Sequence, residues 1–306
     1  MQEARPAALP PIRSPTCRNN GAAGELPYVM TPKGRTILIT GSTDGVGRRV
    51  ALRLGAAGAK VLVHGRNHKR GQQVINEIAK TGNNTAMFYA ADFAALDGVR
   101  DLVAAIGRDH GRLDILINNA GLGSASGGRQ RRVSADGHEL RFAVNYLAGF
   151  TLTRLLLPLI YASAPARIVN VASAGQQAID FDDVMLTRQY SGARAYMQSK
   201  LAQVMFTFDL AREVAGSGVT VNALHPATYM DTTMVRESGT SPISTVDQGA
   251  DAILHLALAD ELADQAGLYY TGTHPSRAQP QAYDQHARAR LRALSYALSG
   301  LPDPTV

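Results

Sequence analysis

Tyr196 and Lys200 stand four residues apart in a stretch of helical periodicity, so their side chains share one helix face. A carbonyl reductase must deliver a proton to the alkoxide that develops as hydride arrives, but a free phenol with a pKa of about 10 exchanges poorly near neutrality. A neighbouring ammonium group favours the phenolate and lowers that pKa. Pairs of Tyr and Lys are also common on helix surfaces, so the pair alone does not establish a site.

Ser173 ends a predicted strand at the carboxyl edge of the sheet, where open α/β sheets bind their ligands. Its hydroxyl can donate a hydrogen bond to a substrate oxygen. We therefore take Ser173 as a candidate partner of Tyr196 and Lys200.

A glycine-rich segment follows the first predicted strand and opens a helix predicted over Arg48 to Ala57. Glycines let the backbone approach a pyrophosphate, and the helix N-terminus offers free N–H groups and a favourable dipole. Such turns also join strands to helices for structural reasons alone, so the pattern by itself leaves binding open. The predicted phosphate site comprises Gly41, Ser42, Thr43, Asp44, Gly45, Val46 and Gly47.

The second predicted strand ends in His64, Gly65, Arg66 and Asn67, without a carboxylate. A carboxylate at this place binds the adenosine ribose of NAD, whereas a cation accommodates the 2′-phosphate of NADP. The guanidinium of Arg66 suits a phosphate. The sequence therefore predicts NADP(H) in preference to NAD(H), with a solvated loop residue as the alternative for Arg66.

These motifs together resemble the short-chain dehydrogenase/reductase family, whose glycine motif reads TGxxxGxG. The matching residues stand in family order across residues 36 to 275: Gly41, Gly45, Gly47, Asn118 to Gly121, Asn145, Ser173, Tyr196 and Lys200. The 23 residues from Ser173 to Tyr196, with Phe181-Asp182-Asp183 and Ala195 to Ala202, look like the retinol dehydrogenase-like branch.

The resemblance implies hydride transfer between the nicotinamide C4 and a carbonyl or alcohol carbon. It implies that Tyr196 is the acid/base, that Ser173 anchors the substrate oxygen, and that Asn145 supports a proton relay. It implies that Lys200 binds the ribose hydroxyls and lowers the pKa of Tyr196. The further cofactor contacts that it implies come from Asp92, Phe93, Asn119, Ala120, Gly121, Tyr196, Lys200 and Pro226.

Two departures from the family pattern concern the ends of strands. Ala172 replaces the first serine of a frequent Ser-Ser pair, which leaves the reacting Ser173 in place. Pro226 is followed by Ala227 where the family usually has glycine, and Asp231 stands where it usually has threonine. The contacts to the nicotinamide carboxamide are therefore open.

The elements that must position these residues alternate between short β-branched runs and helical patterns. The strands are expected at residues 36–40, 60–64, 85–89, 113–118, 166–173, 219–225 and 267–271. Alternation of this kind predicts a single-domain α/β fold: a Rossmann-type, doubly wound, seven-stranded parallel sheet with helices on both faces.

Three regions are expected along the chain: a disordered tail over residues 1–32, the catalytic domain over 33–275, and a C-terminal extension over 276–306 with a docked helix. The tail carries six of the 14 prolines and has no apolar periodicity. Whether translation begins at Met30 is left open. In the extension, Ala287, Leu291 and Leu294 share one helical face.

Composition excludes several classes of protein. The 306 residues are 45% hydrophobic and 18% charged, with a net charge of +6, which indicates a globular domain. The basic residues are scattered, with one cluster at Arg129, Arg131 and Arg132, so nucleic acid is not expected as a partner. Neither a membrane span nor a secretion signal is expected, which predicts a cytoplasmic protein. One cysteine excludes an internal disulfide, and the histidines form no metal set.

A stretch between Pro226 and Thr245 resembles the substrate lid of the family, and residues 176–193 border the same cleft. The soft apolar side chains of the predicted lid suit a small to medium lipophilic ketone, aldehyde or secondary alcohol. Packing of these side chains on the core is an equally good explanation for them.

The resemblance also implies a homodimer or homotetramer paired through long helices, predicted over Ser134 to Tyr161 and Tyr196 to Val214. The alternative function is a non-catalytic NADP-binding regulator that senses redox state.

Overall fold

The computed structural model describes residues 30–126 and 130–304, and residues 1–29 of the tail predicted over residues 1–32 lie outside this range. The first described residue, Met30, packs against the hydrophobic core. The strands are β1 (Thr36–Ile39), β2 (Lys60–Gly65), β3 (Met87–Ala90), β4 (Ile115–Asn118), β5 (Ala166–Val171), β6 (Val219–His225), β7 (Tyr269–Thr271) and β8 (His274–Ser276). The α-helices are α1 (Gly45–Ala56), α2 (His68–Ala79), α3 (Leu96–Asp109), α4 (Ala148–Ala162), α5 (Gly192–Glu213), α6 (Thr233–Glu237), α7 (Val246–Leu258) and α8 (Gln285–Ser299).

The described strands form one sheet in the order β3-β2-β1-β4-β5-β6-β7-β8. From β3 to β7 every neighbouring pair is parallel, and the strand order reverses between β1 and β4. This is a doubly wound α/β sheet of Rossmann type, as the sequence predicts, and it places ligand sites at the carboxyl ends of β1 and β4.

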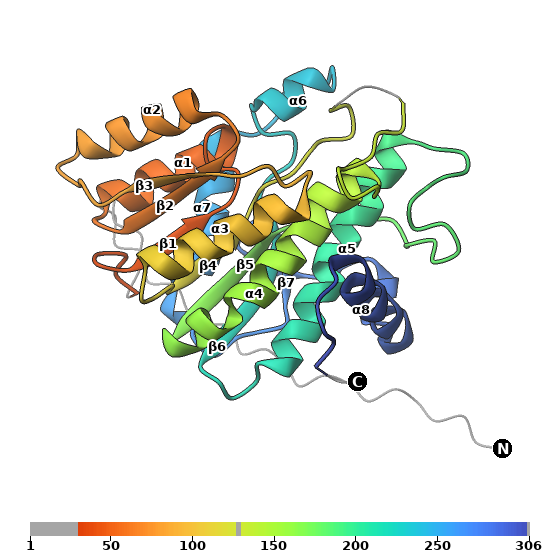
Figure 1. Cartoon of the computed structure of the whole chain (residues 1–306). Coiled ribbons are helices and arrows are strands. Elements are labelled where there is room, and N and C mark those ends of the chain that lie inside the picture. Colours follow the sequence, from red (N-terminus) through yellow and green to blue (C-terminus); the bar gives the residue numbers. More distant parts are fainter. Residues whose placement is uncertain (1–29, 127–129, 305–306) are drawn as a thin grey trace.

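Helices cover both faces of the sheet (Figure 1). One hydrophobic cluster joins α3, α4, α5 and α8 to one face, and a second joins α1, α2 and α7 to the other. The four residues of β1, of β4 and all six of β5 are buried, because each of these strands has helices above and below it. Burial on two faces explains their continuous apolar runs.

The sheet differs from the prediction in having eight strands rather than seven, and in an antiparallel last strand. Gly272, with a φ of 60°, reverses the chain after β7, and β8 returns alongside it. Pro275 in the middle of β8 concealed this strand, since proline is confined to edge strands and removes a ladder hydrogen bond. The predicted boundary at residue 275 falls inside β8, so the C-terminal extension begins within the sheet.

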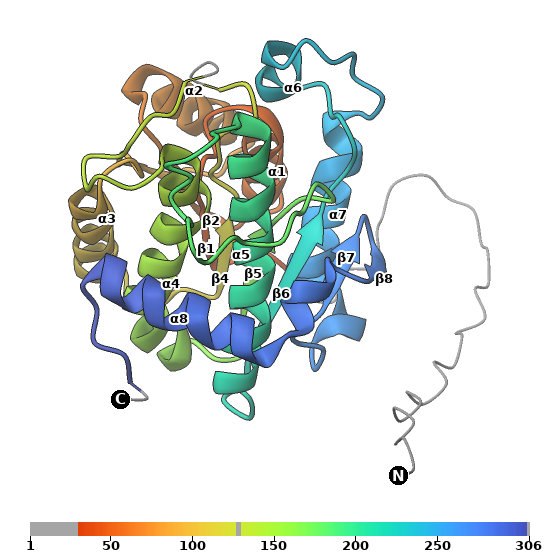
Figure 2. The same ribbon diagram turned by 90° about the vertical axis from the view of Figure 1, so that its right-hand side faces the viewer.

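The extension ends in the docked helix that the sequence predicts. Asp284 caps the N-terminus of α8, and Gly300, in the left-handed conformation, ends it. Figure 2 shows α8 crossing the outer side of α4 and α5. Its side chains bind this layer through a 2.7 Å ion pair from Arg288 to Asp209 and a 2.6 Å hydrogen bond between Ser295 and Tyr146.

The long helix predicted over Ser134 to Tyr161 is shorter at its start. It begins with a π-helical turn, η1 (Phe142–Leu147), and continues directly as α4. Among the described residues, this Phe142–Ala162 stretch alone is long and apolar enough to cross a membrane, but 67% of its most apolar window is buried within the molecule. Burial of this kind is typical of a core helix, and the absence of a membrane span stays a prediction.

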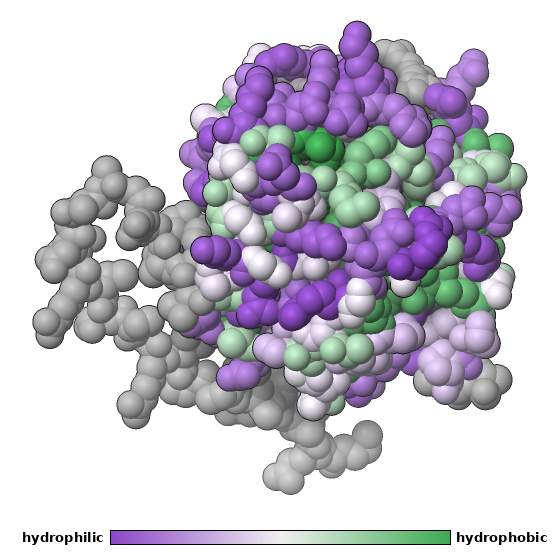
Figure 3. Space-filling view, turned by 60° about the vertical axis from the view of Figure 1, so that its left-hand side comes forward, coloured by the Kyte–Doolittle hydropathy of each residue, from purple (hydrophilic) through white to green (hydrophobic). Residues whose placement is uncertain are grey.

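The face beside β3 and α2 is shown in Figure 3. Hydrophilic residues cover broad areas of it, and hydrophobic residues lie between them in smaller groups. Met87, 39% exposed on the edge strand β3, is one of the described large hydrophobic side chains at the surface. Isolated side chains of this kind are normal on soluble proteins.

Candidate active site

The glycine loop connects β1 to α1 and lies directly against the loop that follows β4. A Cβ atom on Gly41, whose φ is 65°, would come within 2.7 Å of the Ala120 backbone. A Cβ on Gly47 would lie 2.3 Å from the side-chain nitrogen of Asn119 and 2.5 Å from the Gly41 carbonyl. Only glycine fits these positions, and the backbone it leaves open is the kind of cradle that a pyrophosphate needs.

Asn119 fixes this contact between the two loops. Its Nδ2 donates to the Thr40 carbonyl at 2.8 Å and to the Gly41 carbonyl at 3.1 Å. In return, the backbone N–H groups of Asn119 and Ala120 both donate to Thr40 Oγ1 at 2.9 Å. The sequence predicted a cofactor contact for Asn119, and the structure shows in addition that its side chain clamps the loop.

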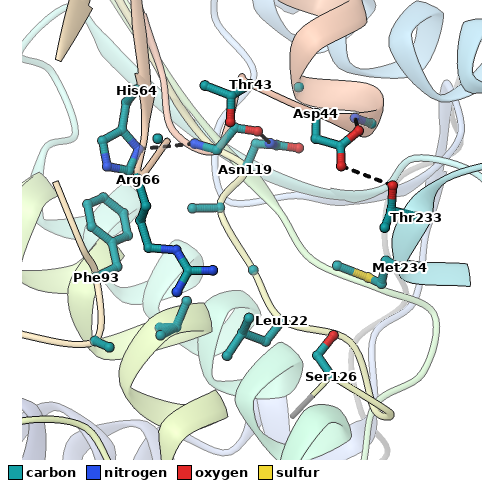
Figure 4. Close-up of a pocket in the computed structure, with 18 of the residues that line it drawn as sticks. Thr43, Asp44, His64, Arg66, Phe93, Asn119, Leu122, Ser126, Thr233 and Met234 are labelled. Atoms are coloured by element: carbon teal, nitrogen blue, oxygen red, sulfur yellow. Dashed lines mark hydrogen bonds between the residues drawn. The ribbon is translucent and has the colours of Figure 1, made fainter. Parts of the chain in front are cut away.

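The side chains of two residues of the predicted phosphate site, Ser42 and Asp44, form hydrogen bonds within the protein. The Ser42 side chain is fully buried, donates to the Ile39 carbonyl and accepts from the His64 N–H. Asp44 caps α1 by accepting from the Gly45 N–H at 2.7 Å, and its other oxygen accepts from Thr233 at 3.0 Å (Figure 4). Helix α1 therefore begins at Gly45, three residues before the predicted start.

His64 is a site residue that sequence reasoning missed. Its Nδ1 accepts the Gly41 N–H at 3.1 Å, and its ring stacks on Phe93 at a centroid distance of 4.3 Å. Burial lowers the pKa of His64 to about 4, so the ring stays neutral and remains an acceptor at neutral pH. The signal in the sequence was its place at the carboxyl end of the second strand, beside the glycine loop.

An open cleft of about 640 Å³ runs along the carboxyl ends of β1, β2 and β4. The predicted cofactor residues that line it are Gly41, Thr43, Asp44, Gly45, Val46, Gly47, Arg66, Asp92, Phe93, Asn119, Ala120 and Gly121. The predicted residues Ser42, Tyr196, Lys200 and Pro226 are not part of this lining.

Arginine side chains gather at the β2 end of the cleft. Figure 4 shows the guanidinium of Arg66 pointing into the cleft, and its side chain is 65% exposed. It faces Asp92 across 3.8 Å, while Arg70, at the start of α2, pairs with Asp44 at 3.3 Å. Arg132 also lines the cleft, whereas Arg131 donates to the Met185 carbonyl and Arg129 lies outside the described residues.

Ser173 and Tyr196 meet where β5 ends against α5. Ser173 is nearly buried, and its Oγ accepts the Gly175 N–H at 3.0 Å. Ser173 Oγ lies 3.5 Å, and Cε1 of the Tyr196 ring 3.8 Å, from the point that a Cβ on Gly175 would occupy, so the two side chains lie close together. Burial raises the pKa of Tyr196, and the Ser173 hydroxyl, as a hydrogen-bond donor to the phenolate, offsets part of that rise. The two hydroxyls are thus arranged to hold one substrate oxygen between them.

Lys200 lies one helical turn beyond Tyr196 and is only 4% exposed. Its Nζ donates to the Val171 carbonyl and to Gln203 Oε1, both at 2.9 Å, and lies 5.8 Å from the centre of the Tyr196 ring. Gln203 is a partner of Lys200 that the sequence did not reveal. Lys200 is not among the groups that set the pKa of Tyr196 here, so the predicted lowering of that pKa by the ammonium stays a prediction.

Burial lowers the pKa of Lys200 to about 7, which predicts a pH-dependent stability. Between about pH 7 and pH 10 the unfolded chain keeps a proton that the folded protein releases, so stability rises with pH in this window. We expect the Tm of the wild type, minus that of Lys200→Met, to rise on the order of 5 °C between about pH 6.5 and pH 9.5. Parallel Tm curves for the two proteins, recorded by calorimetry, would show that Lys200 is not the titrating group.

Asn145 lies in the π-helical turn η1, and such turns are frequent at functional sites. Its Oδ1 accepts the Leu122 N–H at 2.7 Å, and its Nδ2 donates to the Leu122 carbonyl and to Ser199 Oγ. A Cβ on Gly121 would lie 3.4 Å from Asn145 Oδ1 and 3.6 Å from Lys200 Nζ. The structure therefore brings Asn145, Gly121 and Lys200 together.

The two segments expected to border the substrate contain the described non-glycine residues with positive φ. These are Leu186 and Gln189, both at 48°, in the segment 176–193, and Tyr229, at 45°, in the predicted lid. Such strain collects at functional sites. The lid carries the short helix α6, whose Met234 lines the cleft together with Met230 and Thr233. Pro226 follows β6, outside the cleft lining.

Within residues 30–126 and 130–304, no group of histidine, cysteine and acidic side chains is arranged to hold a metal ion. His64 and His68, the pair considered for zinc, have other contacts. His64 faces Gly41, and the ring of His68 meets Phe88 edge-on.

A doubly wound sheet, a glycine cradle at its switch point and a Ser, Tyr and Lys group beside it together define a nicotinamide-dependent oxidoreductase of Rossmann type. A sequence model described as short chain dehydrogenase matches residues 35–242. The chain belongs to the short-chain dehydrogenase/reductase family, and it is an oxidoreductase that acts on CH–OH or C=O groups.

Its relatives place it in the retinol dehydrogenase-like branch. Human retinol dehydrogenase 13 is 38% identical over 92% of this chain and 90% of its own length. Human retinol dehydrogenase 11 is 33% identical over 95% of this chain and 94% of its own length. Among solved structures, a Mycobacterium paratuberculosis protein has a TM-score of 0.73 and 29% identity, covering 89% of this chain and 96% of its own. A short chain dehydrogenase from Escherichia coli complexed with NADPH has a TM-score of 0.66 and 26% identity, covering 80% and 99%.

Proposed function

We propose that this protein is an NADP(H)-dependent oxidoreductase that interconverts a carbonyl and an alcohol on a small to medium lipophilic substrate. The observation that carries the proposal is the proximity of the Ser173 and Tyr196 side chains beside the buried Lys200, next to the glycine-lined cleft. The nicotinamide supplies or accepts the hydride. The residues of the chain bind the substrate and manage the proton.

The proton balance assigns the roles of the side chains. In the direction of reduction, the substrate carbon gains a hydride and its oxygen gains a proton from the Tyr196 hydroxyl. Ser173 donates a hydrogen bond to the same oxygen and stabilises the charge that develops on it. We assign Lys200 to the ribose hydroxyls and Asn145 to the relay that returns a proton to Tyr196. Oxidation follows the same path in reverse.

The preference for NADP(H) rests on the arginines at the β2 end of the cleft. Because Arg66 is 65% exposed and its carboxylate partner is 3.8 Å away, it is free to turn to a phosphate. We expect Arg66→Ala to raise the KM for NADPH about tenfold, the range of one charge-assisted bond, and to leave the KM for NADH within about twofold. Steady-state kinetics with both cofactors check this. Arg108→Ala is the matched control, since Arg108 is an exposed arginine of α3 outside the cleft lining.

The same measurement tests the cofactor assignment of the whole protein. Equal or lower KM values with NADH than with NADPH in the wild type would contradict the NADP(H) proposal. If Arg66→Ala raised the KM for NADPH and the KM for NADH equally, Arg66 would instead act by stabilising the loop.

The lipophilic substrate class is supported by the lid. Met230 and Met234 line the cleft beside Leu122, and methionine side chains adapt to irregular apolar shapes. The names of the relatives point to retinoid alcohols as one kind of substrate to include among others.

A homodimer or homotetramer and a cytoplasmic location stay predictions. Since α8 covers part of α5 from within the same chain, pairing through the long helices has to use the faces that α8 leaves free.

The deciding experiment follows nicotinamide absorbance with NADPH and NADH against a panel of lipophilic aldehydes, ketones and quinones, and with NADP⁺ against the corresponding alcohols. NADPH-dependent turnover supports the proposal. Tight NADPH binding without turnover in either direction over a broad panel would favour the non-catalytic regulator.

A further inference from the structure

The backbone carbonyl of Ser173 is held by two side chains from different parts of the chain. The Tyr269 hydroxyl, on β7, donates to it at 3.0 Å, and Gln176 Nε2 donates to it at 2.7 Å. Tyr269 is 4% exposed, and burial raises its pKa to about 12, so its hydroxyl keeps the proton that it donates. Ser173 therefore has a fixed backbone at the point where its side chain meets Tyr196.

Gln176 is in turn bound to the C-terminal extension. Its Oε1 accepts the Gln279 N–H at 2.9 Å. Two residues after Gln279, the Gln281 side chain binds both backbone groups of Ile179, accepting its N–H at 2.6 Å and donating to its carbonyl at 3.1 Å. The segment that follows Ser173 is thus joined to residues beyond 275, outside the stretch 35–242 that matches the family model.

On its other side the same segment is bound to α5, the helix that carries Tyr196. Gln198 Nε2 donates to the Ala178 carbonyl at 2.9 Å, and Gln198 is only 4% exposed. The Gln177 N–H donates to the Met197 carbonyl at 3.4 Å. Residues 173–179 therefore lie between the helix of the acid/base tyrosine and the C-terminal segment, and bonds on both sides set the position of Ser173.

We propose that Tyr269 is a positioning residue of the active site, which acts with Gln176 and the C-terminal segment 276–281 to hold the Ser173 hydroxyl in register with Tyr196. This inference rests on the proposed carbonyl-alcohol reaction. It assigns a role to Tyr269 and to the C-terminal segment, which hydrogen bonds join to Gln176 and Ile179.

The expected effect is a loss of turnover without a loss of cofactor. A displacement of about 1 Å in a reacting group can cost about 10²-fold in rate, so releasing one of two anchors is expected to lower kcat about tenfold. Tyr269 is not part of the cleft lining, so the Kd for NADPH is expected to stay within about twofold.

The test compares Tyr269→Phe with Tyr270→Phe. Tyr270 is the next residue of β7, is 1% exposed and donates its hydroxyl to Gln265 at 3.3 Å on the opposite face of the sheet, so both variants lose one buried tyrosine hydroxyl. The readouts are kcat, the Kd for NADPH by fluorescence, and hydrogen exchange of the backbone over residues 172–181. We expect Tyr269→Phe alone to lower kcat and to speed exchange in that segment.

A second variant keeps the test independent of any one substitution. Gln176→Leu removes the other anchor, and because both anchors act on one carbonyl, the effects of the two substitutions on exchange are expected to be non-additive in the double variant. The inference would be overturned if Tyr269→Phe and Tyr270→Phe had the same kcat and the same exchange rates. It would also be overturned if Tyr269→Phe sped exchange without lowering kcat, or if it lowered NADPH affinity as much as kcat. Absence of turnover in the wild type would instead contradict the proposed function, and hydrogen exchange would still decide whether Tyr269 anchors Ser173.

Discussion

Replacement of Tyr196 by phenylalanine is expected to lower kcat by about 10²- to 10⁴-fold, the range attributed to positioned acid/base groups. The substitution removes one hydroxyl from a partly buried ring that remains packed beside Lys200 and Gly175. No other described hydroxyl is assigned to proton transfer, because Ser173 serves as a hydrogen-bond donor to the same substrate oxygen. Stopped-flow measurement of NADPH oxidation checks the loss at the chemical step.

Measuring the Kd for NADPH distinguishes a loss of the chemical step in Tyr196→Phe from misfolding of the variant. The ring of Tyr196 lies outside the cleft lining, so the Kd for NADPH is expected to change less than about threefold. Tyr161→Phe, at the exposed end of α4, is the matched control and should keep full activity. A Tyr196→Phe protein that retained most of its rate would refute the assignment of the acid/base.

Replacement of Gly47 by alanine is the second change with a large expected effect. Alanine is favoured over glycine inside a helix by about 1 kcal/mol. Against this, the new Cβ would lie 2.5 Å from the Gly41 carbonyl and 2.3 Å from the Asn119 side chain, which is itself held by two backbone carbonyls. Overpacking of this kind costs about 1–3 kcal/mol or more, so the steric cost wins.

The consequence should be greatest for the cofactor, because the clash is relieved only by moving the loop that cradles it. We expect Gly47→Ala to weaken NADPH binding at least about tenfold and to destabilise the protein by up to about 2 kcal/mol, as the difference of these two terms. Isothermal titration calorimetry and urea unfolding measure the two effects.

Gly107→Ala supplies the control for Gly47→Ala. Gly107 is an exposed helical glycine of α3, and a Cβ there meets nothing within 4 Å. It should stabilise the protein by about 0.5–1 kcal/mol and leave NADPH binding unchanged. If Gly47→Ala behaved like Gly107→Ala, the glycine would not be needed for the close approach of the two loops.

The prediction of β1, β2, β4, β5 and β6 was based on short-range sequence patterns. Each of these strands is a run of β-branched and aliphatic residues between turn signals, and burial on both faces makes such a run nearly continuous. The prediction failed at β8, where Pro275 and the exposed His274 give no strand pattern. Pairing with β7 after the Gly272 turn, a tertiary contact, makes this segment a strand.

In the candidate site, too, some residues were predicted from the sequence and others depend on tertiary contacts. The glycine loop, Asn145, Ser173, Tyr196 and Lys200 were found from residue types, spacing and family order, because each chemical role restricts the residue that can fill it. The partners of these residues were not found. His64 and Tyr269 reach the site from β2 and β7, Gln203 lies one turn beyond Lys200 on α5, and many polar residues have the same donor and acceptor groups.

What the sequence by itself determined is the order of strands and helices, the family, and the residues with the chemistry for hydride and proton transfer. These follow from local periodicity and from motifs whose members are fixed by their own roles. Only the tertiary structure decided that Asn119 clamps the glycine loop, that Lys200 donates to the Val171 carbonyl, and that the C-terminal segment binds Gln176. Those contacts join residues far apart in the chain, and their geometry is set by how the helices and the sheet pack, which no local pattern encodes.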